Sequence, residues 1–128
     1  MKIAYFSLTG NNVKFLKKTN IDHSELVCIK PDLNLKMEED FILLTSTIGI
    51  GQIPEIVVDF LNYEDNHKHL KGVVGSGNKN WGIRYCLAAK NIAKMYNVEN
   101  IFNFELAGNQ HDVKKFLEIY KQLKENHE

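Results

Sequence analysis

The sequence has few of the residues that mark specialised protein classes. Its 128 residues include only two cysteines, Cys28 and Cys86, which stand far apart and form no CxxC or metal-type cluster. We therefore expect reduced thiols in a cytoplasmic protein and no metal site. Lys plus Arg and Asp plus Glu each number 16, so the formal net charge is zero. That balance argues against nucleic acid or an anionic membrane as the main partner, because both select basic surfaces.

Long hydrophobic runs are also absent. The longest apolar run, at residues 41–44, is far too short to cross a bilayer, and the N-terminus lacks the pattern of a secretory signal. The sequence thus predicts a protein that is neither exported nor inserted in a membrane. The hydrophobic share of 44% and the charged share of 25% are typical of globular proteins, and the length fits a single domain over residues 1–128.

What the sequence does contain is a regular alternation of apolar runs and amphipathic stretches. Apolar runs typical of buried strands lie at residues 3–6, 26–29, 41–44, 72–75 and 101–104. Helical spacing appears near residues 13–20, 54–61, 83–96 and 113–123, and the inward stripe of the third helix is expected to be Leu87, Ala88, Ile92 and Met95. This alternation predicts an α/β three-layer sandwich with a five-stranded parallel sheet in the order 2-1-3-4-5. In such sheets ligands bind beyond the carboxyl ends of the strands, so the loops after strands one, three and four are the candidate site.

The first of these loops has the chemistry of a phosphate site. It leads from a strand into a helix, whose first N–H groups are unpaired, and it adds hydroxyls, amides and one glycine. Its residues are Ser7, Leu8, Thr9, Gly10, Asn11 and Asn12. An ordinary helix-capping cluster is the alternative interpretation.

The other two loops are suited to a flat ring. In the second loop, glycines permit close approach of the backbone and isoleucines offer apolar contact, although a plain flexible turn is an alternative. The third loop carries the only Trp, which could contact an aromatic ligand or form a lid over its own loop. The second loop consists of Thr45, Ser46, Thr47, Ile48, Gly49, Ile50 and Gly51, and the third includes Ser76, Gly77, Asn78, Asn80, Trp81 and Gly82. One phosphate loop with two ring loops favours a mononucleotide such as FMN over NAD.

Several residues that often carry catalysis do not form catalytic patterns here. No acidic pair, Ser-His-Asp set or metal cluster is evident, so the flavin itself would perform the chemistry and no side chain is predicted to be catalytic. His67 and His69 are interpreted as part of a solvated loop, and Cys86 as a small packing residue. The third predicted strand has no Asp at its carboxyl end, which argues against a phosphoryl-receiver domain.

Three motifs resemble those of a known family. The S-L-T-G-N run at residues 7–11 resembles the flavodoxin phosphate loop, with Asn12 in place of the usual Thr. The S-G-N-K-N-W-G run at residues 76–82 resembles the S-G-N-R-N-[WF]-G signature of the NrdI flavoproteins, with Lys79 in place of Arg. The F-E-L-A-G run at residues 104–108 is similar to the F-E-L-x-G segment of the same family, and Gly49, Gly51 and Pro54 fit its flavin loop.

The resemblance implies a flavodoxin-like activator of class Ib ribonucleotide reductase. Such a protein binds FMN, is reduced by a flavin reductant that the sequence leaves unidentified, and reacts with dioxygen to give superoxide or peroxide. The oxidant passes to the small, radical-carrying subunit of the reductase, where it assembles the dimanganese–tyrosyl radical cofactor. We expect a monomer that docks this partner near the flavin edge. A neutral chain with Lys79 near the ring should penalise an anionic reduced flavin less than an acidic chain would.

Two other functions stay open at this point. A conventional electron-transfer flavodoxin would use the same fold and the same cofactor. A non-catalytic interaction domain that kept the fold and lost the ligand gains slight support from Asn12, which replaces a phosphate-binding Thr.

Overall fold

The predicted parallel sheet is confirmed in the computed structural model, which describes residues 1–47 and 51–126. All neighbouring strands run parallel, in the order β2-β1-β3-β4-β5. The strands are β1 Lys2–Tyr5, β2 Leu26–Cys28, β3 Phe41–Ser46, β4 Leu70–Gly77 and β5 Asn100–Glu105. The α-helices are α1 Asn11–Thr19, α2 Glu55–Asn62, α3 Leu87–Met95 and α4 Gln110–Asn126, with 3₁₀ segments at His23–Glu25, Tyr63–His69 and Lys79–Arg84.

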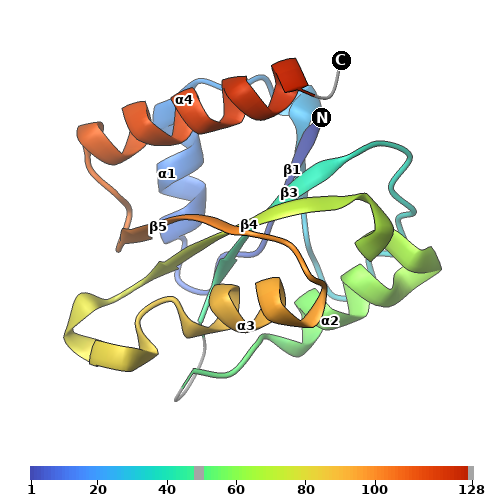
Figure 1. Ribbon diagram of the computed structural model, residues 1–128, viewed down its shortest axis with the longest axis horizontal. Helices are drawn as coiled ribbons and strands as arrows, with labels where there is room; N and C mark the ends of the chain where they lie inside the picture. Colours follow the sequence, from blue (N-terminus) through green and yellow to red (C-terminus); the bar gives the residue numbers. More distant parts are fainter. Residues whose placement is uncertain (48–50, 127–128) are drawn as a thin grey trace.

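Helices cover both faces of the sheet, which makes a three-layer sandwich (Figure 1). Helices α1 and α4 lie on one face and α2 and α3 on the other. The alternation of side chains along a strand explains this arrangement, because neighbouring residues point to opposite faces. On β3, Ile42 and Leu44 pack toward Phe15 and Phe116 of α1 and α4, whereas Leu43 packs toward α2 and α3. Both faces of β3 are therefore buried, as its continuous apolar sequence predicts.

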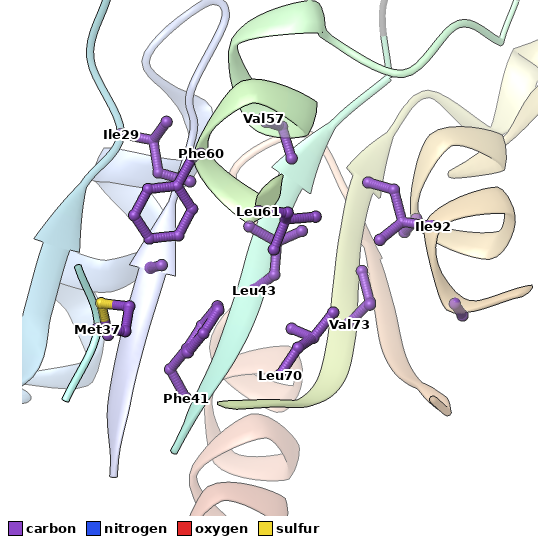
Figure 2. Close-up of a cluster of buried hydrophobic side chains, with 13 residues drawn as sticks. Ile29, Met37, Phe41, Leu43, Val57, Phe60, Leu61, Leu70, Val73 and Ile92 are labelled. Carbon is purple, nitrogen blue, oxygen red and sulfur yellow. The ribbon is translucent and has the colours of Figure 1, made fainter. Parts of the chain in front are cut away.

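The core on the α2 and α3 side is a continuous cluster of aliphatic and aromatic side chains (Figure 2). Phe60 and Leu61 of α2 lie over β1 and β3, and Ile92 of α3 lies beside Val73 of β4. Phe41 packs edge-on against Phe60, with ring centroids 5.8 Å apart. These contacts pack the two helices against the sheet and so help to position the loops at its carboxyl edge.

Two boundaries differ from the sequence-based expectation. Strand β4 continues through Ser76 and Gly77, which pair with the last residues of β5, so these two residues belong to a strand. Helix α3 begins at Leu87, and the preceding 3₁₀ segment Lys79–Arg84 occupies the start of the expected helix. None of the helices within residues 1–47 and 51–126 combines the length and apolar character needed to cross a bilayer.

The inward face of α3 also differs from the expected stripe. Ala88, Ala89, Ile92 and Ala93 are buried, whereas Met95 is 57% exposed. The reason is close packing on β4: a Cβ built at Gly75 would lie 2.8 Å from the Ala89 Cβ and 2.9 Å from the Cys86 Cβ. Small residues on the helix and on the strand therefore bring α3 against the sheet directly below the third predicted loop.

Candidate functional site

A cavity of about 190 Å³ lies at the carboxyl edge of the sheet. Its walls are formed by the last residues of β3 and β4 and by segments that follow β1, β3, β4 and β5, so described residues of all three predicted loops line it. Its lining residues are Leu8, Thr9, Asn11, Ser46, Thr47, Ser76, Gly77, Asn78, Trp81 and Leu106. Ile48, Gly49 and Ile50, which were also predicted to bind the ligand, lie outside the described residues. Gly51 is buried against α3, with a φ of +110°.

One end of the cavity, residues 7–12 together with Ser46, is rich in hydroxyl and amide groups and is called the polar end here. Gly10 precedes α1 in a left-handed conformation, with a φ of +84°, and its carbonyl accepts a hydrogen bond from the Lys14 N–H. The Asn12 N–H donates to Ser7 Oγ over 3.2 Å, and the Leu8 N–H donates to Ser46 Oγ over 3.4 Å. The first turn of α1 carries no acidic side chain, so its partial positive charge is directed at the cavity without a competing carboxylate.

Asn12 supports the polar end from inside the protein. Its side chain is fully buried, and Nδ2 donates to the Phe6 carbonyl over 2.7 Å and to Ser46 Oγ over 3.3 Å. The amide thereby joins the loop after β1 to the end of β3. Within the described residues Asn12 Oδ1 has no hydrogen-bond partner although it is buried. Asn12 is absent from the cavity wall, so its structural place is behind the loop.

Two threonines predicted at the site have different surroundings. Thr45 is fully buried in β3, and its hydroxyl donates to the Ser46 carbonyl over 3.0 Å. Thr47 lines the cavity, and its Oγ1 accepts a hydrogen bond from the Ala88 N–H over 3.0 Å. Because Cys86 at the start of α3 provides no side-chain cap, Thr47 satisfies one of the first N–H groups of that helix. Thr47 thus connects the end of β3 to α3.

The opposite end, residues 78–82 with Leu106, is called the Trp81 end here. Asn78 Oδ1 accepts a hydrogen bond from the Asn80 N–H, and the Asn78 carbonyl accepts one from the Trp81 N–H. Gly82 follows with φ 60° and ψ −123°, a conformation that favours glycine. The Trp81 side chain is 43% exposed although it contacts the cavity, and Leu106 is 53% exposed.

The end of β5 contributes two residues that sequence reasoning did not assign to the site. Leu106 lines the cavity, and its N–H donates to the Gly77 carbonyl over 2.9 Å. Glu105 accepts a hydrogen bond from the Lys79 N–H through Oε2, over 3.0 Å. The F-E-L-A-G run was the available signal, because it places both residues at the carboxyl end of the fifth predicted strand.

The residues that follow the Trp81 end in the chain, Tyr85 and Cys86, lead into the buried start of α3. Cys86 is fully buried, and its burial raises the pKa of the thiol to about 11. Burial also raises the pKa of the neighbouring Tyr85 hydroxyl, and the Cys86 thiol and the carboxylates of Asp112 and Glu105 add to that effect. Both groups are therefore neutral at physiological pH. Within residues 1–47 and 51–126, His, Cys, Asp and Glu side chains form no cluster of three or more that could hold a metal ion.

Comparisons with known proteins agree with this architecture. A family described as "NrdI Flavodoxin like" matches residues 3–118. Among solved structures, a short-chain flavodoxin associated with a bacterial microcompartment is similar, with a TM-score of 0.69. That structure is 15% identical in sequence, and the match covers 99% of this chain and 97% of the other. At this level of identity the structural match shows the fold.

Proposed function

This chain belongs to the NrdI flavodoxin-like family, and we propose that it binds FMN and uses it to produce superoxide or peroxide for the small subunit of a class Ib ribonucleotide reductase. In that subunit the oxidant would assemble the dimanganese–tyrosyl radical cofactor. The family implies a flavin cofactor; the FMN site, the oxidant and the partner are the parts that we propose. The observation that carries the proposal is that the cavity at the carboxyl edge of the sheet has two chemically different ends.

The residues at the polar end fit a phosphate group. The backbone N–H groups at the start of α1 and the hydroxyls of Ser7 and Thr9 supply donors around a glycine that lets the backbone approach. A Cβ at Gly10 would meet no atom of residues 1–47 and 51–126 within 4 Å, so none of the described residues fills the space beside it. A phosphate needs several donors held in place before it arrives, and the Asn12 amide holds this loop against β3.

The residues at the Trp81 end fit a flat heterocycle. Trp81 and Leu106 supply apolar surface in the cavity wall, and Asn78 supplies an amide. Aromatic side chains favour stacked or edge contacts with other rings, which accounts for a half-exposed Trp at this position. A ligand with a phosphate at one end and an aromatic ring at the other, as in FMN, matches both ends of the cavity.

The redox chemistry would come from the cofactor, and the protein would set binding and access. Bound FMN, reduced by an external flavin reductant, supplies the electrons that convert dioxygen to superoxide or peroxide. The chain contains equal numbers of acidic and basic residues, and Lys79 is exposed at the Trp81 end. Negative charge near the ring would disfavour an anionic reduced flavin, so a neutral chain suits an oxidant-producing role.

A three-step experiment tests the proposal. FMN added to the purified protein should lose its fluorescence on binding and give a yellow complex. After anaerobic photoreduction, admission of air should cause fast reoxidation with superoxide, measured as the part of cytochrome c reduction that superoxide dismutase inhibits. Finally, addition of the complex to the manganese-loaded small subunit of a class Ib reductase should give a tyrosyl radical signal in electron paramagnetic resonance.

Each step also has a result that contradicts part of the proposal. A colourless protein that leaves FMN fluorescence unchanged would favour an interaction domain without a cofactor. Slow reoxidation through a long-lived blue radical form would favour a conventional electron-transfer flavodoxin. Fast superoxide production without any tyrosyl radical in the small subunit would retain the redox chemistry and exclude the proposed partner.

A further inference from the structure

The loop that carries Trp81 obtains little order from burial. Residues 79–84 are all exposed, and Ile83 in this segment is 90% exposed. Apart from the Trp81 side chain, which is 43% exposed and forms part of the cavity wall, hydrophobic packing therefore contributes little to the position of the loop. Hydrogen bonds must supply much of its order, and their positions identify the residue that most constrains the loop.

Two hydrogen bonds connect this region to the end of β5. The Leu106 N–H donates to the Gly77 carbonyl over 2.9 Å and extends the pairing of β4 with β5. Two residues further along, the Lys79 N–H donates to Glu105 Oε2 over 3.0 Å. The second bond uses a charged acceptor, and charge-assisted hydrogen bonds are stronger than neutral ones. It is also the contact that lies within the exposed segment.

The bonds inside the loop start beside this contact. Asn78 receives hydrogen bonds from the N–H groups of Asn80 and Trp81, so the peptide of Lys79 lies at the centre of the turn that positions the indole. A carboxylate that fixes the Lys79 N–H fixes this turn. Without it, the turn would keep the partial burial of Trp81 and the chain on either side, but it would lose its side-chain hydrogen bond to β5.

The backbone of Glu105 is held in place by a turn that packs against the core. It ends β5, and its carbonyl accepts a hydrogen bond from the Gly108 N–H over 2.9 Å, which closes a turn. Lys18 Nζ donates to the carbonyl of Gly108 over 2.9 Å, and a Cβ at Gly108 would lie 2.6 Å from the Phe15 ring. The turn therefore rests on the buried core beside α1, and the carboxylate reaches the loop from a fixed position.

We propose that Glu105 is a positioning residue for the Trp81 end: its carboxylate, through the Lys79 N–H, holds the loop in the conformation that places Trp81 against a bound flavin ring. That the ring is a flavin rests on the proposed function, whereas the positioning of the loop by Glu105 does not depend on it. The acidic side chain of the F-E-L-A-G run thereby gains a defined role, which is to join the end of β5 to the loop that follows the neighbouring strand β4.

The test compares two substitutions at position 105 with a control. Glu105→Ala removes the acceptor, whereas Glu105→Gln keeps an oxygen that can accept the Lys79 N–H bond. Glu118→Ala removes an exposed carboxylate on α4, away from the loop. Because Trp81 is the only tryptophan, acrylamide quenching of its fluorescence reports the exposure of this loop directly, in protein without FMN. Urea unfolding checks that each variant is folded.

We expect Glu105→Ala to increase quenching of Trp81 and to weaken FMN binding about five-fold. Glu105→Gln, which can keep the hydrogen bond but loses its charge assistance, should show a clearly smaller effect in both measurements, and Glu118→Ala should match the wild type. Unchanged quenching in Glu105→Ala, or equal effects of Ala and Gln at this position, would overturn the proposal. If the wild-type protein binds no FMN, the proposed function fails, but the quenching comparison still decides whether Glu105 holds the loop.

Discussion

The two ends of the cavity are built in different ways. The polar end is anchored inside the protein, because the Asn12 side chain is fully buried and bonded to Phe6 and Ser46. The Trp81 end stands at the surface and is connected to β5 by hydrogen bonds of Glu105 and Leu106. A change at the polar end should therefore disturb folding and ligand binding together. A change at the Trp81 end should alter the loop and the ligand and leave global stability nearly intact.

The largest expected effect comes from Asn12→Asp. This change replaces the buried Nδ2 donor with an oxygen that faces the Phe6 carbonyl and Ser46 Oγ, both of which accept from Nδ2 in the wild type. We expect the free energy of unfolding to fall by at least about 2 kcal/mol and FMN binding to be lost, since a buried carboxylate would also repel the phosphate. Urea unfolding and FMN titration measure the two effects.

The pH dependence of this variant gives a second check. Burial should raise the pKa of the introduced carboxyl above its unfolded value of about 4, because desolvation disfavours the charged form. The penalty should then be smallest below pH ~4, where both states are protonated, and should grow as the pH rises toward the folded-state pKa. Asn80→Asp is the matched control at the exposed Trp81 end, where we expect stability to change by less than about 0.5 kcal/mol. Equal losses in the two variants would contradict the comparison.

Thr47→Val tests the position between the two ends. Valine has nearly the shape of threonine but cannot accept the hydrogen bond from the Ala88 N–H. We expect a loss of about 1–2 kcal/mol in unfolding free energy, because a buried N–H at the start of α3 would lack its partner. Thr47→Ser keeps the hydroxyl and should recover most of this loss. If Val and Ser behave alike in urea unfolding, the hydroxyl has no capping role.

The architecture could be predicted from the sequence because it depends on local patterns. Each strand is an apolar run and each helix has an apolar stripe, so the order of elements follows from spacing alone. The carboxyl end of β4 was assigned to a loop because Ser76 and Gly77 are not apolar, and their strand character comes from pairing with β5. Met95 was expected to face inward, but Ala89 and Ala93 occupy that face because β4 has a glycine opposite the helix.

The roles of the supporting side chains could not be predicted in the same way. Asn12 was recognised as a departure from the phosphate-loop pattern, but its bond to Ser46 joins residues 34 positions apart. The contact of Glu105 with Lys79 spans 26 positions. Such pairs depend on which strands are neighbours in the sheet and on how far each loop extends beyond it. A sequence motif can identify the residues, but their contacts follow from the three-dimensional arrangement.

A glycine-to-alanine substitution at each end compares how the two ends respond to backbone strain. Gly10 and Gly82 both have positive φ, and a Cβ at either position would meet no atom of the described residues within 4 Å, so alanine introduces backbone strain without a clash there. At Gly10, in the left-handed helical region, the strain should be about 1–2 kcal/mol. At Gly82, where ψ is −123°, it should be larger, because residues with a Cβ rarely adopt that conformation. In Gly10→Ala the strain should lower the urea midpoint, because α1 packs into the core. In Gly82→Ala it should leave the midpoint unchanged and increase acrylamide quenching of Trp81. The reverse pattern would show that the loop, and not α1, belongs to the cooperative core.

The smallest expected effect concerns whether a change in the Trp81 loop also exposes the buried Cys86 next to it. Cys86 lies directly beneath this end, fully buried, with a thiol pKa of about 11, so only about 0.1% of it is thiolate at pH 8. In a Cys28→Ser background, iodoacetamide should therefore label Cys86 very slowly in the native protein and quickly in urea. Gly82→Ala in the same background should not speed up the native reaction, because its strain is confined to the exposed loop. Faster labelling in that variant would mean that opening the loop also opens the contact of α3 with β4. The Trp81 end would then be coupled to the core, as the polar end is, and the two ends would differ only in how strongly they are coupled to it.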